Sequence, residues 1–90
     1  MFEILEQLMQ TIRERKSSSP DSSYTNKLLN DKNLSVAKVK EEIGELIVAV
    51  EKDTNKIHEA ADVMYHLMVY LEANNIKIED VMSELKKRQK

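Results

Sequence analysis

The stretch Glu59-Ala-Ala-Asp-Val-Met-Tyr-His-Leu-Met-Val-Tyr-Leu71 decides the fold class of this chain. Its strongly polar side chains are Glu59, Asp62 and His66, and at about 100° per residue in a helix these three fall on one narrow stripe. Apolar side chains cover most of the remaining surface, a pattern that is typical of a buried helix. A buried carboxylate is strongly unfavourable unless it is paired or binds a metal. Asp62 therefore needs a partner from another part of the chain.

Composition favours a small all-α protein that forms one domain over residues 1–90. The chain of 90 residues has one glycine and one proline, which disfavours sheets with tight turns. This length lies near the small end of what a single hydrophobic core supports. Since one helix is apolar nearly all round, we expect oligomerisation to help cover it.

Charge and cysteine content exclude several classes of function. The 14 basic and 16 acidic residues are well mixed and give a net charge of −2, so we expect no general attraction to nucleic acid or to a membrane surface. The absence of cysteine excludes disulfides and thiolate metal sites and fits a reducing cytoplasm. The first residues lack the basic segment of a signal peptide, and the longest uncharged apolar run, Val63–Leu71, is too short to span a bilayer. We therefore expect a soluble cytoplasmic protein.

Apolar periodicity predicts a bundle of four or five helices. The polar run Ser17–Ser23 contains Pro20, which prevents the first helix from continuing, and Ser22 or Ser23 can cap a short second helix. Ser35 is a suitable N-cap for the third helix. The expected helices span residues 2–16, 24–29, 36–52, 56–73 and 78–87. The last helix is expected to turn four apolar residues inward: Ile78, Val81, Met82 and Leu85.

Three carboxylates share one side of the third predicted helix. Glu41, Glu42 and Glu45 lie within roughly 100° of one another. The opposite side is an apolar stripe of Val36, Val39, Ile43, Leu46, Ile47 and Val50. A loop of about three residues leads to the fourth helix, which favours a central antiparallel helix pair. In such a pair Glu59 and Asp62 lie level with the second and third of these carboxylates, because each set is about ten residues from the turn. Four carboxylates then face one another across an interhelical groove.

This arrangement of carboxylates calls for a cation. Hard oxygen ligands without a cluster of histidine or cysteine favour Mg²⁺ or Mn²⁺ over zinc. A di-iron centre fits poorly because it uses Glu-x-x-His pairs, and Asp62 stands where the histidine is needed. The alternative is a solvated acidic face with Lys38 and Lys40 as surface partners.

The pattern Glu41-Glu42-x-x-Glu45 followed by Glu59-x-x-Asp62 resembles the signature of the all-α NTP pyrophosphatase superfamily. Further elements resemble one branch of it, the phosphoribosyl-ATP pyrophosphatase family of histidine biosynthesis, over about residues 4–88. These elements are Arg15-Lys16, Ser23-Tyr24-Thr25 with Leu28, Lys38-Val39, Tyr65-His66-Leu67, Asp80-Val81, and Leu85 with Arg88. Two positions depart from that family's pattern: Asp31 stands where glycine is usual, and Lys77 stands where a capping serine is common.

The resemblance implies Mg²⁺-dependent hydrolysis of phosphoribosyl-ATP to phosphoribosyl-AMP and pyrophosphate by a homodimer. It implies four metal ligands: Glu42, Glu45, Glu59 and Asp62. Glu41 is then a ligand to a second metal or the group that orients the attacking water. A metal held by carboxylates neutralises charge on the leaving phosphate, which agrees with this chemistry.

Six further residues are candidates for contacts with the substrate: Arg15, Lys16, Tyr24, Lys38, Tyr65 and His66. The three cations can bind the triphosphate or serve only as surface charge. Tyr24 can stack on a base or pack on the third helix. Tyr65 and His66 can orient carboxylates, although a lone buried histidine is more often a satisfied core group.

Two other functions share parts of this pattern. A housecleaning pyrophosphatase acting on dUTP or non-standard nucleoside triphosphates would use the same four ligands, and a substrate panel would separate it. A non-catalytic, dimerising helical module would carry the acidic face without a metal. Its melting temperature would not respond to divalent ions.

Overall fold

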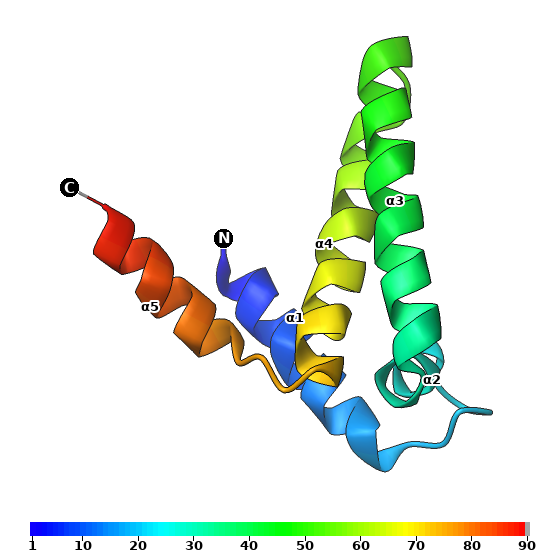
Figure 1. Ribbon diagram of the computed structural model, residues 1–90, viewed down its shortest axis with the longest axis vertical. Coiled ribbons are helices and arrows are strands. Elements are labelled where there is room, and N and C mark those ends of the chain that lie inside the picture. Colours follow the sequence, from blue (N-terminus) through cyan, green and yellow to red (C-terminus); the bar gives the residue numbers. More distant parts are fainter. Residues whose placement is uncertain (90) are drawn as a thin grey trace.

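The structure, a computed structural model, describes residues 1–89. Over this range it contains helices and no β-strand, which confirms the predicted all-α fold (Figure 1). The elements are α1 (Glu3–Glu14), the 3₁₀ segment η1 (Arg15–Ser17), α2 (Tyr24–Asn30), α3 (Lys32–Lys52), α4 (Lys56–Ala73) and α5 (Ile78–Arg88). No helix in the described part of the chain is both long enough and apolar enough to cross a membrane.

The predicted antiparallel helix pair is confirmed at the centre of the fold. The helices α3 and α4 run side by side in opposite directions (Figure 1). Asp53 and Asn55 in the turn between them are left-handed, with φ of 56° and 49°. Short polar side chains adopt this conformation more readily than other residues with a Cβ. The Thr54 amide donates to the Ala49 carbonyl at 3.0 Å, which satisfies one of the free carbonyls at the end of α3.

The start of α3 differs from the prediction. The helix begins at Lys32, because the Asp31 carboxylate accepts a hydrogen bond from the Leu34 amide at 3.0 Å and caps the helix there. Ser35, the predicted cap, is instead a buried residue inside the helix, and its Oγ has no hydrogen-bond partner. The other predicted cap is confirmed, since the Ser23 Oγ accepts from the Asn26 amide at the start of α2.

The hydrophobic core lies at the lower end of α4, where α1 and α2 pack against it (Figure 1). Its buried residues are Met9, Ile12, Leu28, Met68 and Val69. The α3–α4 hairpin extends well beyond this core, and there the two helices pack mainly on each other (Figure 1). The chain thus consists of a packed base and a protruding two-helix arm.

Part of the predicted apolar packing is absent from the arm. The face of α3 that is buried carries Ser35, Val39, Glu42 and Ala49. The predicted apolar stripe is therefore turned outward at its far end, where Ile43, Ile47 and Val50 are 44%, 54% and 58% exposed. The prediction that α4 is buried all round is also wrong for the single chain, because Met64 and Leu67 are 46% and 42% exposed.

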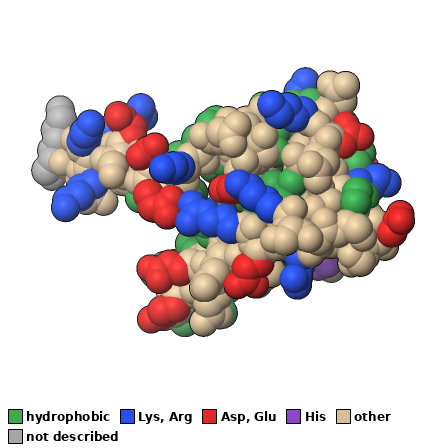
Figure 2. Space-filling model, turned by 90° about the horizontal axis from the view of Figure 1, so that it is seen from below, with side chains coloured by type: hydrophobic (Ala, Val, Ile, Leu, Met, Phe, Trp, Pro, Cys, Tyr) green, Lys and Arg blue, Asp and Glu red, His purple; other side chains and the backbone are tan. Residues whose placement is uncertain are grey.

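Helix α5 packs as predicted at its start, where Ile78 contacts the hydrophobic core, but not farther along. It projects away from the α3–α4 hairpin beyond its first turn (Figure 1). Arg13 of α1 holds that first turn through two hydrogen bonds to Glu79, at 2.9 and 2.7 Å. Acidic and basic side chains lie next to one another where α5 leaves the body (Figure 2). Met82 and Leu85 are each 50% exposed, so the prediction that they face inward is wrong for the single chain.

Candidate functional site

Three of the predicted metal ligands meet between α3 and α4. One carboxylate oxygen each from Glu42, Glu45 and Glu59 lies within 4.8 Å of the other two. The first two stand about one turn apart on α3, and the hairpin brings Glu59 of α4 level with them. Glu42 is buried, Glu59 is half-buried and Glu45 is exposed. The site therefore has a closed side against α4 and a side open to solvent.

The electrostatics of this cluster suit a cation. Burial raises the pKa of the Glu42 carboxyl, and the neighbouring Glu45 raises it further. Burial and Glu45 raise the pKa of Glu59 in the same way. One oxygen of Glu42 and one of Glu59 are buried and have no hydrogen-bond partner among residues 1–89. A buried carboxylate oxygen that lacks a hydrogen-bond donor destabilises the folded protein. Such oxygens are suitable ligands for a hard divalent ion.

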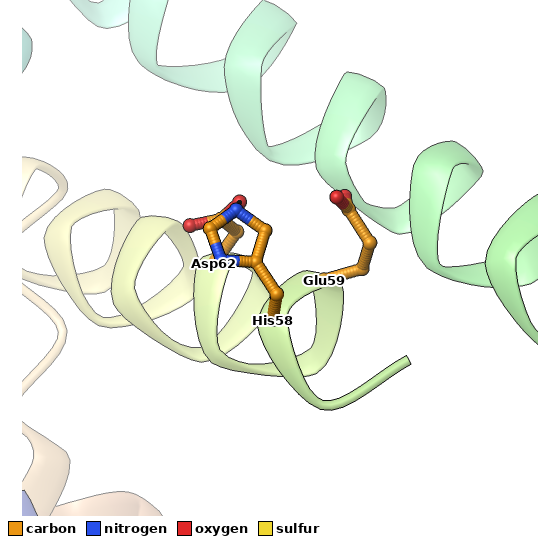
Figure 3. A group of neighbouring side chains, drawn as sticks. All are labelled: His58, Glu59 and Asp62. Atoms are coloured by element: carbon orange, nitrogen blue, oxygen red, sulfur yellow. Dashed lines mark ion pairs between the residues drawn. The ribbon is translucent and has the colours of Figure 1, made fainter. Parts of the chain in front are cut away.

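Asp62, the fourth predicted ligand, lies beside this cluster with a partner of its own. Its Oδ2 is 3.3 Å from the Nε2 of His58, one turn earlier on α4. Figure 3 shows these two side chains together, while Glu59 reaches toward α3. His58, Glu59 and Asp62 can each offer one ligand atom within 4.8 Å of the others. His58 is not among the residues predicted from sequence, although its spacing of four from Asp62 on a helix signals this contact.

Lys38 and Glu41 form an ion pair on the outer side of the cluster. The Lys38 Nζ donates to the Glu41 Oε2 at 2.8 Å. This bond raises the pKa of Lys38 and lowers that of Glu41. Glu41 is exposed and therefore lies outside the group of three carboxylates that converge.

The aromatic residues form two links between α2 and α4. The Tyr24 hydroxyl lies 3.3 Å from the Nε2 of His66, and the His66 Nδ1 lies 2.9 Å from the backbone carbonyl of Asp62. The Tyr65 hydroxyl bonds the Thr25 Oγ1. The Tyr65 ring also meets the His66 ring edge-on, with centroids 4.9 Å apart. These links place the first turn of α2 against the middle of α4.

Arg15 and Lys16 are not brought to the carboxylates. Arg15 is exposed in η1, and its backbone carbonyl accepts a hydrogen bond from the Asn26 side chain at 2.7 Å. The Lys16 ammonium pairs with Glu72, a buried residue near the end of α4. Glu72 follows Asp62 by ten residues, or about 15 Å along the helix. Contact of these two cations with a substrate therefore stays a prediction.

A cavity of about 570 Å³ opens beside the carboxylate cluster, toward the turn of the hairpin. It is lined by Glu41, Gly44, Glu45, Val48, Ala49, Lys52, Thr54, Asn55 and Glu59. Among the described residues, no atom from beyond the local helix backbone lies within 4 Å of the place where a Cβ of Gly44 would stand, so this wall of the cavity is open. The cluster is therefore reachable by a molecule the size of a nucleotide phosphate group.

Comparison with known proteins gives a consistent result. Residues 5–89 match the family described as phosphoribosyl-ATP pyrophosphohydrolase. The phosphoribosyl-ATP pyrophosphatases of Trichlorobacter lovleyi and Clostridium acetobutylicum are each 47% identical to the chain, over 94% and 96% of it and 82% and 81% of their own lengths. That of Caulobacter sp. (strain K31) is 40% identical over 99% of the chain and 85% of its own length. No solved structure gives a significant match.

Proposed function

The chain belongs to the phosphoribosyl-ATP pyrophosphohydrolase family, and on that basis we propose that it hydrolyses phosphoribosyl-ATP to phosphoribosyl-AMP and pyrophosphate in histidine biosynthesis. It is a hydrolase of a phosphoanhydride bond, as are the relatives that share this name. Membership also favours an enzyme over a non-catalytic helical module. The main support for the proposed site is that three carboxylates converge. Two of them have a buried oxygen that lacks a partner among residues 1–89.

The proposed cofactor is Mg²⁺, with Mn²⁺ as a substitute. Glu42, Glu45 and Glu59 would hold the ion, and Asp62 would join them by turning from His58. When bound, the ion supplies positive charge for the phosphate oxygens and orients the attacking water. Glu42 would hold the ion from the buried side of the site, and Glu45 would hold it from the exposed side, which is open to the substrate.

Lys38 is the proposed contact for the substrate's phosphates. Its ammonium lies beside Glu41 at the rim of the site, where it can exchange this exposed carboxylate for a phosphate oxygen. Glu41 is then freed to orient water, the role we propose for it. Lys16 would need to leave Glu72 to reach the same phosphates, so we propose a smaller contribution from it.

The test is release of pyrophosphate from phosphoribosyl-ATP with Mg²⁺, measured beside ATP, dUTP and dCTP at equal concentration. We expect strong preference for phosphoribosyl-ATP. Preference for a plain nucleotide would contradict the proposal and assign the chain to housecleaning of nucleotides. Neither outcome depends on knowing the number of metal ions.

Substitution of Asp62 tests the metal site. Asp62→Asn keeps the size of the side chain and removes its charge, so we expect turnover to fall at least about 100-fold while the helical circular dichroism signal is retained. The matched control is Glu51→Gln, which removes a charge from an exposed residue of α3 away from the site. Near-wild-type turnover of Asp62→Asn would remove Asp62 from the proposed ligands.

We also propose that the chain acts as a homodimer that buries the outer face of the hairpin arm. Large apolar side chains away from the carboxylates are exposed on both helices of the arm: Ile43, Ile47, Val50, Ile57, Met64 and Leu67. Exposed apolar side chains that gather on one part of a single chain are typical of an interface. A second copy would supply the cover that the single chain lacks.

A further inference from the structure

The contact between His66 and the backbone carbonyl of Asp62 fixes which nitrogen of the neutral imidazole carries the proton. The backbone carbonyl of Asp62 can only accept a hydrogen bond, so the His66 Nδ1, 2.9 Å away, must be its donor. In the neutral ring the Nε2 is then an acceptor. The Tyr24 hydroxyl at 3.3 Å must therefore donate to it. The order of donors is Tyr24 to His66, and His66 to the backbone of α4.

Tyr24 is therefore held at its hydroxyl, while the rest of its side chain is partly exposed to solvent. His66 is buried and meets the Tyr24 ring edge-on, with centroids 6.1 Å apart and an interplanar angle of 74°. The Tyr24 side chain is nonetheless 47% exposed. Packing on α3, the alternative considered from sequence, would cover the ring more fully. An aromatic ring that is held through its hydroxyl and is about half exposed has surface left on which a second ring can stack.

The place of the ring relates it to the carboxylate site. Burial raises the pKa of the Tyr24 hydroxyl, with Lys38 acting against this and Glu42 and Glu41 adding to it. These three charged side chains all belong to α3. Geometry gives the same relation, because Tyr24 contacts His66 and His66 contacts the backbone carbonyl of Asp62. The ring is thereby held beside the turn of α4 that carries Asp62, at the rim of the carboxylate site.

We propose that His66 is a positioning residue that holds the Tyr24 ring at this rim, where the ring stacks on the purine base of the substrate. The proposal rests on the function proposed above and adds the part of the substrate that Tyr24 recognises. In this proposal the Tyr24 hydroxyl anchors the side chain, since it donates its hydrogen bond to His66. The ring surface is then the part that contacts the base.

Four variants distinguish the role of the Tyr24 ring from that of its hydrogen bond to His66. Tyr24→Leu removes the stacking surface, and Tyr24→Phe keeps it but loses the bond to His66. His66→Asn keeps an N–H in place of Nδ1–H for the Asp62 carbonyl but loses the acceptor for Tyr24. His66→Gln places an amide oxygen near the position of Nε2 and restores an acceptor for the Tyr24 hydroxyl.

The readout is KM and kcat for phosphoribosyl-ATP with Mg²⁺. We expect Tyr24→Leu to raise KM roughly 5- to 100-fold, as base stacking on an aromatic side chain predicts, with little change in kcat. Tyr24→Phe and His66→Asn should each raise KM about 2- to 10-fold, the effect of one hydrogen bond. Their double variant should be no worse than the more affected single variant, because both remove the same link. His66→Gln should lie closer to the wild type than His66→Asn.

Several results would overturn the proposal. Independent, multiplying effects of Tyr24→Phe and His66→Asn on KM would show that the two residues do not act through one link. An unchanged KM in Tyr24→Leu would remove the stacking contact. Thermal melts of each variant show whether a raised KM comes from misfolding. For a variant that misfolds, NMR of His66 in the wild type decides instead.

Nitrogen-15 NMR of His66 tests the link without any substrate. We expect a proton on Nδ1 and none on Nε2, and a shift of the Nε2 resonance in Tyr24→Phe. A proton on Nε2 of the neutral ring would overturn the proposal. If the wild type prefers a plain nucleotide, the proposed function fails, yet the NMR result and the KM series on that nucleotide still decide whether Tyr24 and His66 act together.

Discussion

At the scale of single residues, the proposed metal site works against the stability of the free protein. Glu42 is 7% exposed, one of its oxygens has no hydrogen-bond donor, and Glu45 stands beside it. Burial and this like charge disfavour the ionised form, which raises the pKa of Glu42. Such a residue is kept for its chemistry rather than for its contribution to folding.

We therefore predict opposite effects of Glu42→Gln on stability and on activity. The amide removes a buried negative charge and can donate to the neighbouring carboxylate, so the metal-free variant should melt a few degrees above the wild type. Turnover of phosphoribosyl-ATP should be lost. Differential scanning calorimetry in EDTA measures the first effect, with Glu51→Gln as the control that changes the same net charge at an exposed position.

The same variant should lose the response to Mg²⁺. For the wild type, Mg²⁺ at 100 times its Kd should stabilise the fold by about 2.7 kcal/mol, or roughly 10–20 °C in Tm for a domain of this size. Glu51→Gln should respond like the wild type. An equal rise of Tm in Glu42→Gln would place the ion elsewhere, and no rise in any of the three proteins would contradict the metal site.

The residues of the site were predictable from sequence to the extent that helical spacing decides their place. Glu42, Glu45 and Glu59 meet because a short turn sets two helices antiparallel. The partner of Asp62 was missed, because His58 lies at the first turn of α4 among exposed residues and no apolar pattern marks it. The pairing of Tyr24 with His66 joins residues 42 positions apart, which no local pattern shows.

At the scale of elements, charge holds α5 at its root. Arg13 of α1 makes a bidentate pair with Glu79 in the first turn of α5, and this pair lowers the pKa of Glu79 to about 2. Arg13 also lies 3.5 Å from Glu72 of α4, so a single guanidinium joins three helices. The apolar residues farther along α5 contribute little in the single chain, since Met82 and Leu85 are half exposed.

This pair predicts a pH dependence for the attachment of α5. A carboxyl whose pKa is lower in the folded state than in the unfolded state adds stability above its unfolded value of 4.5, and the gain is lost as the pH falls toward 2. The difference in Tm between the wild type and Glu79→Gln should thus be present at pH 7 and vanish near pH 2. Both residues are accessible to solvent, so high salt should also reduce it.

Thermal melts at several pH values check this expectation. Glu84→Gln is the matched control, because Glu84 lies on the same helix and, within residues 1–89, its ion pair is with Arg88, one turn away. Its difference from the wild type should be small throughout. A difference for Glu79→Gln that persists at pH 2 would show that the Arg13 pair is not its cause.

Element boundaries followed from sequence where one signal dominated. The range of α4 is predicted correctly because Asp53–Asn55 and Asn74-Asn75 interrupt a strongly apolar helix. The start of α3 is four residues early because Asp31 and Ser35 are both good caps, and the sequence alone does not rank them. The packing of α5 was predicted from periodicity, which marks an apolar face but not the element that covers it.

At the scale of the whole molecule, apolar surface is distributed unevenly. The buried core lies at the base, while the arm exposes large aliphatic side chains on both of its helices. The buried side of the arm contains Glu42 and also His66, which contacts Tyr24 of α2. Because the carboxylates take the inner face of α3, the apolar stripe of that helix is left to face a second molecule.

The last prediction concerns this outer face of the arm. Ile47 is 54% exposed at its middle, so Ile47→Asp should cost the single chain little but should place a charge inside the proposed interface. We expect the wild type to have twice the mass of one chain in light scattering at micromolar concentration and Ile47→Asp to be monomeric. Ile4→Asp is the control, since Ile4 is an equally apolar residue, 65% exposed, on α1. It should remain dimeric, and a dimer of Ile47→Asp would mean that a different surface joins the two chains.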